Sequence, residues 1–144
     1  MSLLTLKQAE IIIDRALEKA REMKLPALAV VVLDDSGNVK AVKREDGASM
    51  FRVDIGQAKA WGAVAMGCSS RALANRAKQN QNFFVTLAAT AGGKFLPQQG
   101  GVLIRDAAGN VLGAVGISGA SGDEDELCGA FGVEQAGLKP DVSG

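Results

Sequence analysis

One six-residue pattern occurs twice in this sequence and constrains the fold more than any other feature. Asp34-x-x-Gly37-Asn38-Val39 and Asp106-x-x-Gly109-Asn110-Val111 each follow an apolar run, and an Ala-Val pair comes soon after each. The aspartate side chain accepts hydrogen bonds from turn amides, and glycine or asparagine supplies the positive φ that tight turns need. The repeat therefore predicts two copies of one β-hairpin, the first with strands at 27–33 and 39–44.

Two capping boxes predict where helices begin. Thr5 with Gln8 opens an amphipathic helix over 5–24, and Ser121 with Glu124 opens a last helix that ends near Gly137. The pattern of residues 80–91 is ambiguous, and one or two further helical turns are the interpretation it allows. A helix of small residues is predicted over 53–67, a short helix over 71–79 and a loop over 92–101.

This order of elements predicts an α+β fold in a single domain that covers residues 1–144. Its centre is an antiparallel sheet built from the two similar hairpins, and N-terminal, middle and C-terminal helices pack on it. Residues 1–4 and 139–144 are predicted to fray, because the ends of a domain are poorly ordered unless other segments hold them.

Charge and composition exclude several classes of protein. Lys plus Arg and Asp plus Glu both number 16, so no net field favours nucleic acid or an anionic membrane. No apolar run is long enough to span a bilayer, and no signal-peptide pattern opens the chain. Cys68 and Cys128 form no CxxC pair and are interpreted as buried apolar side chains. These features predict a cytoplasmic protein without nucleic-acid or membrane partners.

The chain has no histidine, and this excludes every catalytic or metal site that needs an imidazole. Ser-His-Asp and Cys-His catalysis, HExxH metal sites and histidine-ligated haem are all excluded. Any general acid or base must come from Asp, Glu, Lys, Cys or bound water. No metal site is predicted.

The glycine-rich stretch 100–129 could in principle bind phosphate or hold a nucleophile. It lacks the lysine of the Gly-Lys-Ser/Thr that ends a Walker loop, and its three-residue glycine spacing does not match GxGxxG. The carboxylates at 123–126 would also repel a phosphate at that helix start. Gly116-Ile117-Ser118-Gly119-Ala120 lacks the last glycine of a nucleophile elbow. The acidic run is interpreted as helix capping and a solvated surface, and Gly100–Gly101 as backbone that lines a cleft.

Four blocks of the sequence resemble the GlcG/HbpS-like family of haem-binding proteins, which includes PduO C-terminal-type domains. These blocks are LTLKQAEIIIDRALEKA, AVVVLDDSGNVKAVKREDGA, IGQAKAWGAVAMG and GGVLIRDAAGNVLGAVGISGASGDEDE. The resemblance implies a profilin-like layered fold, a symmetric homo-oligomer such as an octamer, and a small organic or tetrapyrrole ligand. It also implies that the ligand lies in a cleft near a subunit interface.

The resemblance carries over polar and glycine positions, and Phe95 is added as part of the apolar tip of the loop 92–101. The ligand-binding candidates are Arg44, Asp46, Lys59, Phe95, Gly100 and Gly101. Haem is the cofactor that the resemblance suggests. Without histidine, its iron could take only methionine or cysteine as a strong protein ligand, or haem could bind through its propionates to Arg and Lys.

Three hypotheses follow. The first is an oligomeric ligand-binding protein with Arg44 and Lys59 as carboxylate partners. The second is an enzyme on the same scaffold that acts on a small carboxylate or carbonyl compound, with Lys59 as base or electrostatic stabiliser and Asp46 or Arg44 orienting it. The third is an accessory oligomer whose assembly face is the small-residue helix, so that bulky side chains at Ala60 or Ala63 would break it.

Overall fold

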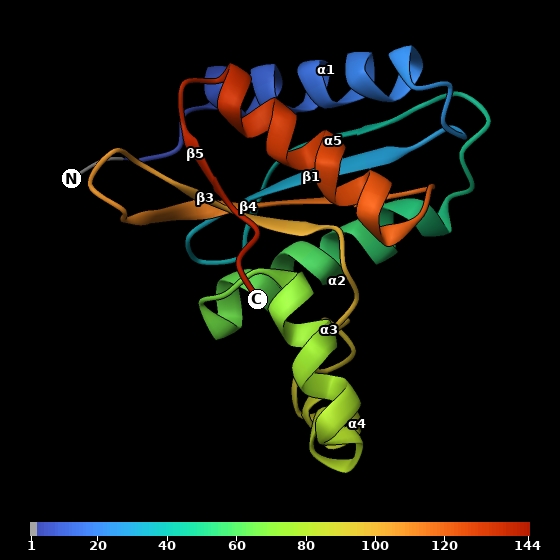
Figure 1. The fold of residues 1–144 in the computed structure, drawn as a ribbon, viewed down its shortest axis with the longest axis vertical. Coiled ribbons are helices and arrows are strands. Elements are labelled where there is room, and N and C mark those ends of the chain that lie inside the picture. Colours follow the sequence, from blue (N-terminus) through green and yellow to red (C-terminus); the bar gives the residue numbers. More distant parts are fainter. Residues whose placement is uncertain (1–2) are drawn as a thin grey trace.

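The two predicted hairpins lie side by side in the computed structural model, which describes residues 3–144 (Figure 1). The helices are α1 (Leu6–Glu22), α2 (Phe51–Met66), α3 (Ser70–Gln79), α4 (Gln81–Thr90) and α5 (Gly122–Gln135). The strands are β1 (Ala29–Asp34), β2 (Val39–Arg44), β3 (Gly101–Arg105), β4 (Val111–Ser118) and β5 (Lys139–Asp141).

The sheet is antiparallel throughout, in the order β2-β1-β4-β3-β5. β1–β2 and β3–β4 are the hairpins, and β1–β4 pairing joins them from Ala29 opposite Ser118 to Asp34 opposite Gly113. Both turns use the predicted aspartate: Asp34 Oδ1 accepts from the Asn38 N–H at 3.0 Å and Asp106 Oδ1 from the Asn110 N–H at 2.8 Å. The predicted α+β class and central antiparallel sheet are therefore confirmed.

Helices cover both faces of the sheet (Figure 1). The apolar stripe of α1 and the inner face of α5 pack on one side, where Ile12, Ile13 and Val133 join Val30 and Ile117 of the sheet in the main core. α2 covers the other face and closes a smaller core. Both capping boxes form as predicted, at Thr5 with Gln8 and at Ser121 with Glu124.

The small residues of α2 bring its backbone against β4. A methyl group added at Gly116 would lie 1.8 Å from the Gly56 carbonyl oxygen, so no larger residue fits there. Ala60 and Ala63 are fully buried against the same sheet. The hypothesis that α2 is an assembly face is therefore wrong, because its small-residue side is covered by the chain's own strands.

The C-terminal segment is ordered, contrary to the prediction that 139–144 frays. β5 pairs with β3, and Asp141 Oδ2 accepts from the Arg105 Nε–H at 2.9 Å. The Ser143 carbonyl accepts from the Ser69 hydroxyl at 2.7 Å. At the other end Leu4 is buried in the main core, while residues 1 and 2 of the predicted frayed start lie outside the described residues. Long-range pairing, which local composition does not encode, holds both segments.

The ambiguous stretch 80–91 is helical. α4 follows α3 after one residue, and the two helices project from the side of the sheet that α2 covers (Figure 1). A third cluster of Leu73, Phe84 and Phe95 ties the base of this pair to the body.

Candidate functional site

Arg44 and Asp46 lie where β2 leaves the sheet. They border a hollow of about 530 Å³, which also involves Leu17 and Arg21 of α1 and Lys43 of β2. The loop that follows β2 is fixed by Glu45, whose Oε1 accepts from the Leu28 N–H at 2.8 Å and whose N–H donates to the Leu28 carbonyl at 2.9 Å. One backbone and one side-chain hydrogen bond therefore hold this wall of the hollow to Leu28.

Arg44 is the cation of this hollow that has no acidic partner within the described chain. Arg21 Nε lies 3.0 Å from Glu45 Oε2, and Lys43 Nζ lies 2.7 Å from Asp14 Oδ1, which raises the pKa of Lys43 through a hydrogen bond and charge attraction. Arg44 donates only to the Ala48 carbonyl and is exposed. A guanidinium with free donors is suited to a carboxylate or phosphate.

Lys59 lies inside the protein. Its side chain is 7% exposed, and Nζ donates to the Ile117 carbonyl at 2.9 Å and to Asp125 Oδ2 at 3.2 Å. The other oxygen, Asp125 Oδ1, accepts from the Ala120 N–H at 3.0 Å. Burial raises the pKa of Asp125, and the Lys59 charge opposes this rise. The pair links α2 to the start of α5, and the ammonium does not reach the hollow beside Arg44.

Gly100 and Gly101 accommodate Lys59. A methyl group at Gly100 would lie 2.7 Å from Lys59 Nζ, and one at Gly101 would lie 2.5 Å from the Lys59 carbonyl oxygen. The Gly101 N–H donates to Ser70 Oγ at 2.6 Å. Both glycines are buried, so they serve close packing rather than exposing backbone to a cleft.

Phe95 belongs to the third cluster. It is 5% exposed and stacks on Phe84 with ring centroids 5.9 Å apart. Its ring also fills the space above Gly62, where a methyl group would lie 2.8 Å from Cδ1. The six predicted site residues thus separate into Arg44 and Asp46 at the hollow, and a buried group of Lys59, Phe95, Gly100 and Gly101.

The prediction that the acidic run at 123–126 is only a cap and a solvated surface is partly wrong. Glu124 completes the capping box, but Asp125 and Glu126 are buried and ion-paired with Lys59 and Arg71. Helical spacing could have revealed this, because Asp125 shares a face with Cys128 and Gly129. A carboxylate on an apolar helix face needs a cationic partner.

A family model described as haem degrading protein HbpS-like matches residues 4–134. The chain belongs to this HbpS-like family. No curated protein sequence matches the chain. Within residues 3–144, no helix has the length and apolar composition of a membrane span, and no three His, Cys, Asp or Glu side chains gather as a metal site would need.

Solved structures share the fold over nearly the whole chain. A PduOC:haem complex has a TM-score of 0.86 at 22% identity, with 97% of this chain and 99% of the other covered. The Klebsiella pneumoniae protein ORFY has a TM-score of 0.85 at 25% identity, with coverage of 95% and 93%. HbpS has a TM-score of 0.79 at 27% identity, with coverage of 93% and 90%. The likeness to PduOC, at that identity, concerns the fold alone.

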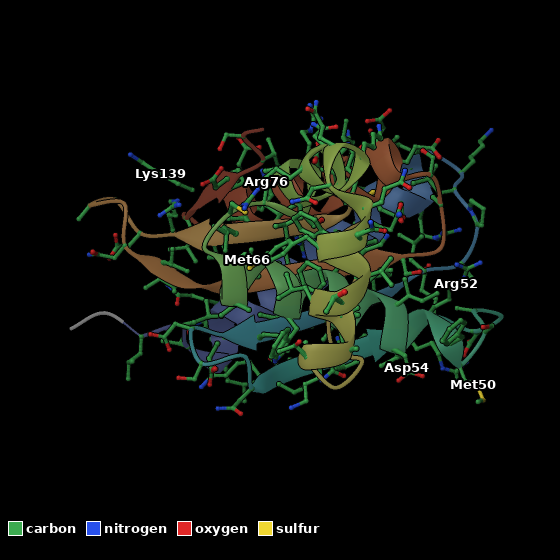
Figure 2. All side chains as sticks on the ribbon, turned by 90° about the horizontal axis from the view of Figure 1, so that it is seen from below. Met50, Arg52, Asp54, Met66, Arg76 and Lys139 are labelled. Carbon is green, nitrogen blue, oxygen red and sulfur yellow. The ribbon has the colours of Figure 1, made fainter. Side chains whose placement is uncertain are left out.

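The hollow beside Arg44 fits the carboxylates of haem but supplies no ligand for its iron. Within residues 3–144, none of the cysteine or methionine side chains lines it. Cys128 is fully buried, and burial raises its thiol pKa to about 11, so it stays protonated at neutral pH. Met50 is 81% exposed and points outward at one end of the molecule (Figure 2).

Proposed function

We propose that this HbpS-like protein binds a small organic or tetrapyrrole ligand through the ligand's carboxylates in the hollow beside Arg44. The unpaired guanidinium of Arg44 carries this proposal. Family membership and the haem named for PduOC support the ligand class. The hollow of about 530 Å³ is within the usual range for ligand sites.

The proposal includes a cytoplasmic homo-oligomer with an even number of subunits, such as an octamer, and a ligand site near a subunit interface. Arg44 would bind a ligand carboxylate, with Asp46 on the rim of the same hollow as a second polar contact. If haem is the ligand, its propionates would contact Arg44, and its iron would receive no ligand from this hollow. An iron-free porphyrin is then expected to bind as well as haemin.

Titrations of the purified protein with haemin, an iron-free dicarboxylate porphyrin and a small organic dicarboxylate test this proposal. Arg44→Gln removes the charge, and Arg15→Gln, on the surface of α1, is the matched control. Loss of a charge-assisted hydrogen bond is expected to weaken binding by about tenfold or more. Arg15→Gln should bind as wild type does.

Three outcomes would contradict the proposal. Haemin, porphyrin and dicarboxylate could all fail to give saturable binding. Arg44→Gln could bind as tightly as wild type. Haemin could bind far more tightly than the iron-free porphyrin, which would mean that the iron is ligated by a side chain outside the hollow.

A further inference from the structure

The helices α3 and α4 form an arm with an uncovered apolar surface (Figure 1). Phe84 is the only buried residue of α4, whereas Phe83 is 48% and Val85 is 72% exposed. No charged residue occurs from 79 to 93. A ten-residue helix with little burial gains little stability from its own chain, so this surface is suited to a partner.

Charge is divided unevenly between residues 55–105, the segment that contains the arm, and the rest of the chain. Residues 55–105 contain six Lys and Arg and no Asp or Glu. The remaining residues contain ten Lys and Arg and sixteen Asp and Glu. Three of the six cations pair with acids of other segments, as in Arg71 with Glu126. Arg76, Lys78 and Lys94 make no ion pair within the described chain, and all three lie on or beside the arm. Arg76 is labelled in Figure 2.

A hollow on α5, on the sheet face away from α2, has acidic side chains without ion-pair partners in the described chain, whereas the unpaired charges of the arm are basic. It measures about 550 Å³ and we call it the α5 groove. Leu127, Phe131 and Val142 give it an apolar floor, and Leu127 is 45% exposed. Asp123 and Glu134 stand on its border without an ion-pair partner in residues 3–144. Lys19 and Arg71 also border the groove, but they are ion-paired with Glu22 and Glu126. The unpaired charges of the α5 groove are therefore acidic, and with the apolar floor they complement the arm.

We propose that the arm of one copy docks in the α5 groove of a second copy of this chain. Val85 would cover the apolar floor and Lys78 would face Glu134. Phe83 lies two residues before Val85 in α4, so it points to another side of the helix, where it borders a hollow with Arg76. The contact joins two different surfaces, so it closes into a ring or extends as a filament. This inference rests on the oligomer included in the proposed function and names its interface.

A second copy fits the arm better than the other possible partners do. Pairing one arm with another would bring Arg76, Lys78 and Lys94 of two copies together, which like charges oppose. Nucleic acid would suit the cations but not Val85, an aliphatic side chain on which a base cannot stack. The acid-rich remainder of the same chain supplies both the charge and the apolar floor.

Native mass spectrometry and light scattering of the full chain test the interface. Val85→Glu puts a charge on the apolar surface, and Val39→Glu is the control, because Val39 is 51% exposed on the edge strand β2. The dissociation constant of the assembly is expected to rise about tenfold or more for Val85→Glu and to stay unchanged for Val39→Glu. Circular dichroism confirms that each variant is folded.

A charge exchange keeps the proposal testable if Val85→Glu disturbs α4. Lys78→Glu should weaken assembly, Lys40→Glu on β2 should not, and adding Glu134→Lys to Lys78→Glu should restore assembly. Restoration is expected only if an arm meets an α5 groove. It would not occur for arms that pair with each other.

Several results would overturn this inference. The wild-type chain could be a monomer, with or without bound nucleic acid. Val85→Glu could assemble as wild type does, or the Lys78 and Glu134 exchange could fail to restore assembly. The ligand titrations are repeated on Val85→Glu, because Arg44 lies outside this interface. An oligomer that survives Val85→Glu while ligand binding is intact contradicts the interface alone. Assembly lost in Val85→Glu, with no saturable ligand binding even in wild type, contradicts the ligand proposal alone.

Discussion

Replacing Lys59 by methionine would leave the Asp125 carboxylate buried with one hydrogen bond, from the Ala120 N–H. The two side chains are 7% and 2% exposed, so water cannot replace the lost ammonium. Removing one partner of a buried pair costs about 3–5 kcal/mol. With a urea m value of about 2 kcal/mol/M, the unfolding midpoint should fall by about 2 M.

The loss should depend on pH. Burial raises the pKa of Asp125, and Lys59 opposes this rise together with the Ala120 hydrogen bond and the Arg52 charge, so Lys59→Met raises the pKa further. Above the folded pKa the variant carries a buried, unpaired charge, and its destabilisation is then greatest. As the pH falls toward 3.8, the ordinary value for the carboxyl, Asp125 is protonated and the difference from wild type shrinks.

Urea unfolding at pH 7 and at pH 4, followed by Trp61 fluorescence, measures both effects. Lys40→Met is the control, an exposed lysine whose loss should change stability by less than about 0.5 kcal/mol. Adding Asp125→Asn to Lys59→Met should recover part of the loss at pH 7, because the amide oxygen can still accept from Ala120. A variant as stable as wild type that no longer binds ligand would refute this reasoning and restore Lys59 to the ligand site.

Further predictions concern the C-terminal strand, the helix–sheet contact and the third cluster. Burial acts to raise the pKa of Asp141, but hydrogen bonds from Ser143 and Arg105 outweigh it and lower the pKa. Asp141→Asn should therefore cost about 1 kcal/mol at pH 7, and the cost should vanish as the pH falls below 3.8; a loss independent of pH would contradict this. Gly116→Ala should cost at least about 3 kcal/mol in thermal or urea unfolding, because its methyl group meets a backbone carbonyl, and a neutral result would contradict the close α2–β4 contact. Phe95→Ala should cost about 3–5 kcal/mol while the affinity for the carboxylate ligand stays unchanged, whereas a stable variant with weakened binding would place Phe95 in the ligand site.

The sequence could predict the features that local chemistry controls. Capping boxes at Thr5 and Ser121 and the aspartate turns at Asp34 and Asp106 use hydrogen bonds within a few residues, so they are visible in the sequence. The fold class followed from the order of these elements. Arg44 and Asp46 border one hollow, and their role in binding a ligand stays a prediction.

Tertiary structure decided which surfaces are covered and which charges are paired. Lys59 looks like any helical lysine until Asp125, 66 residues later, is packed against it. Residues 139–141, predicted to fray, form β5 because they pair with the edge of β3. The apolar surface of α4 is exposed because α4 projects away from the sheet. Local patterns set the elements, whereas burial depends on contacts between segments far apart in the chain, and no short stretch of sequence encodes those contacts.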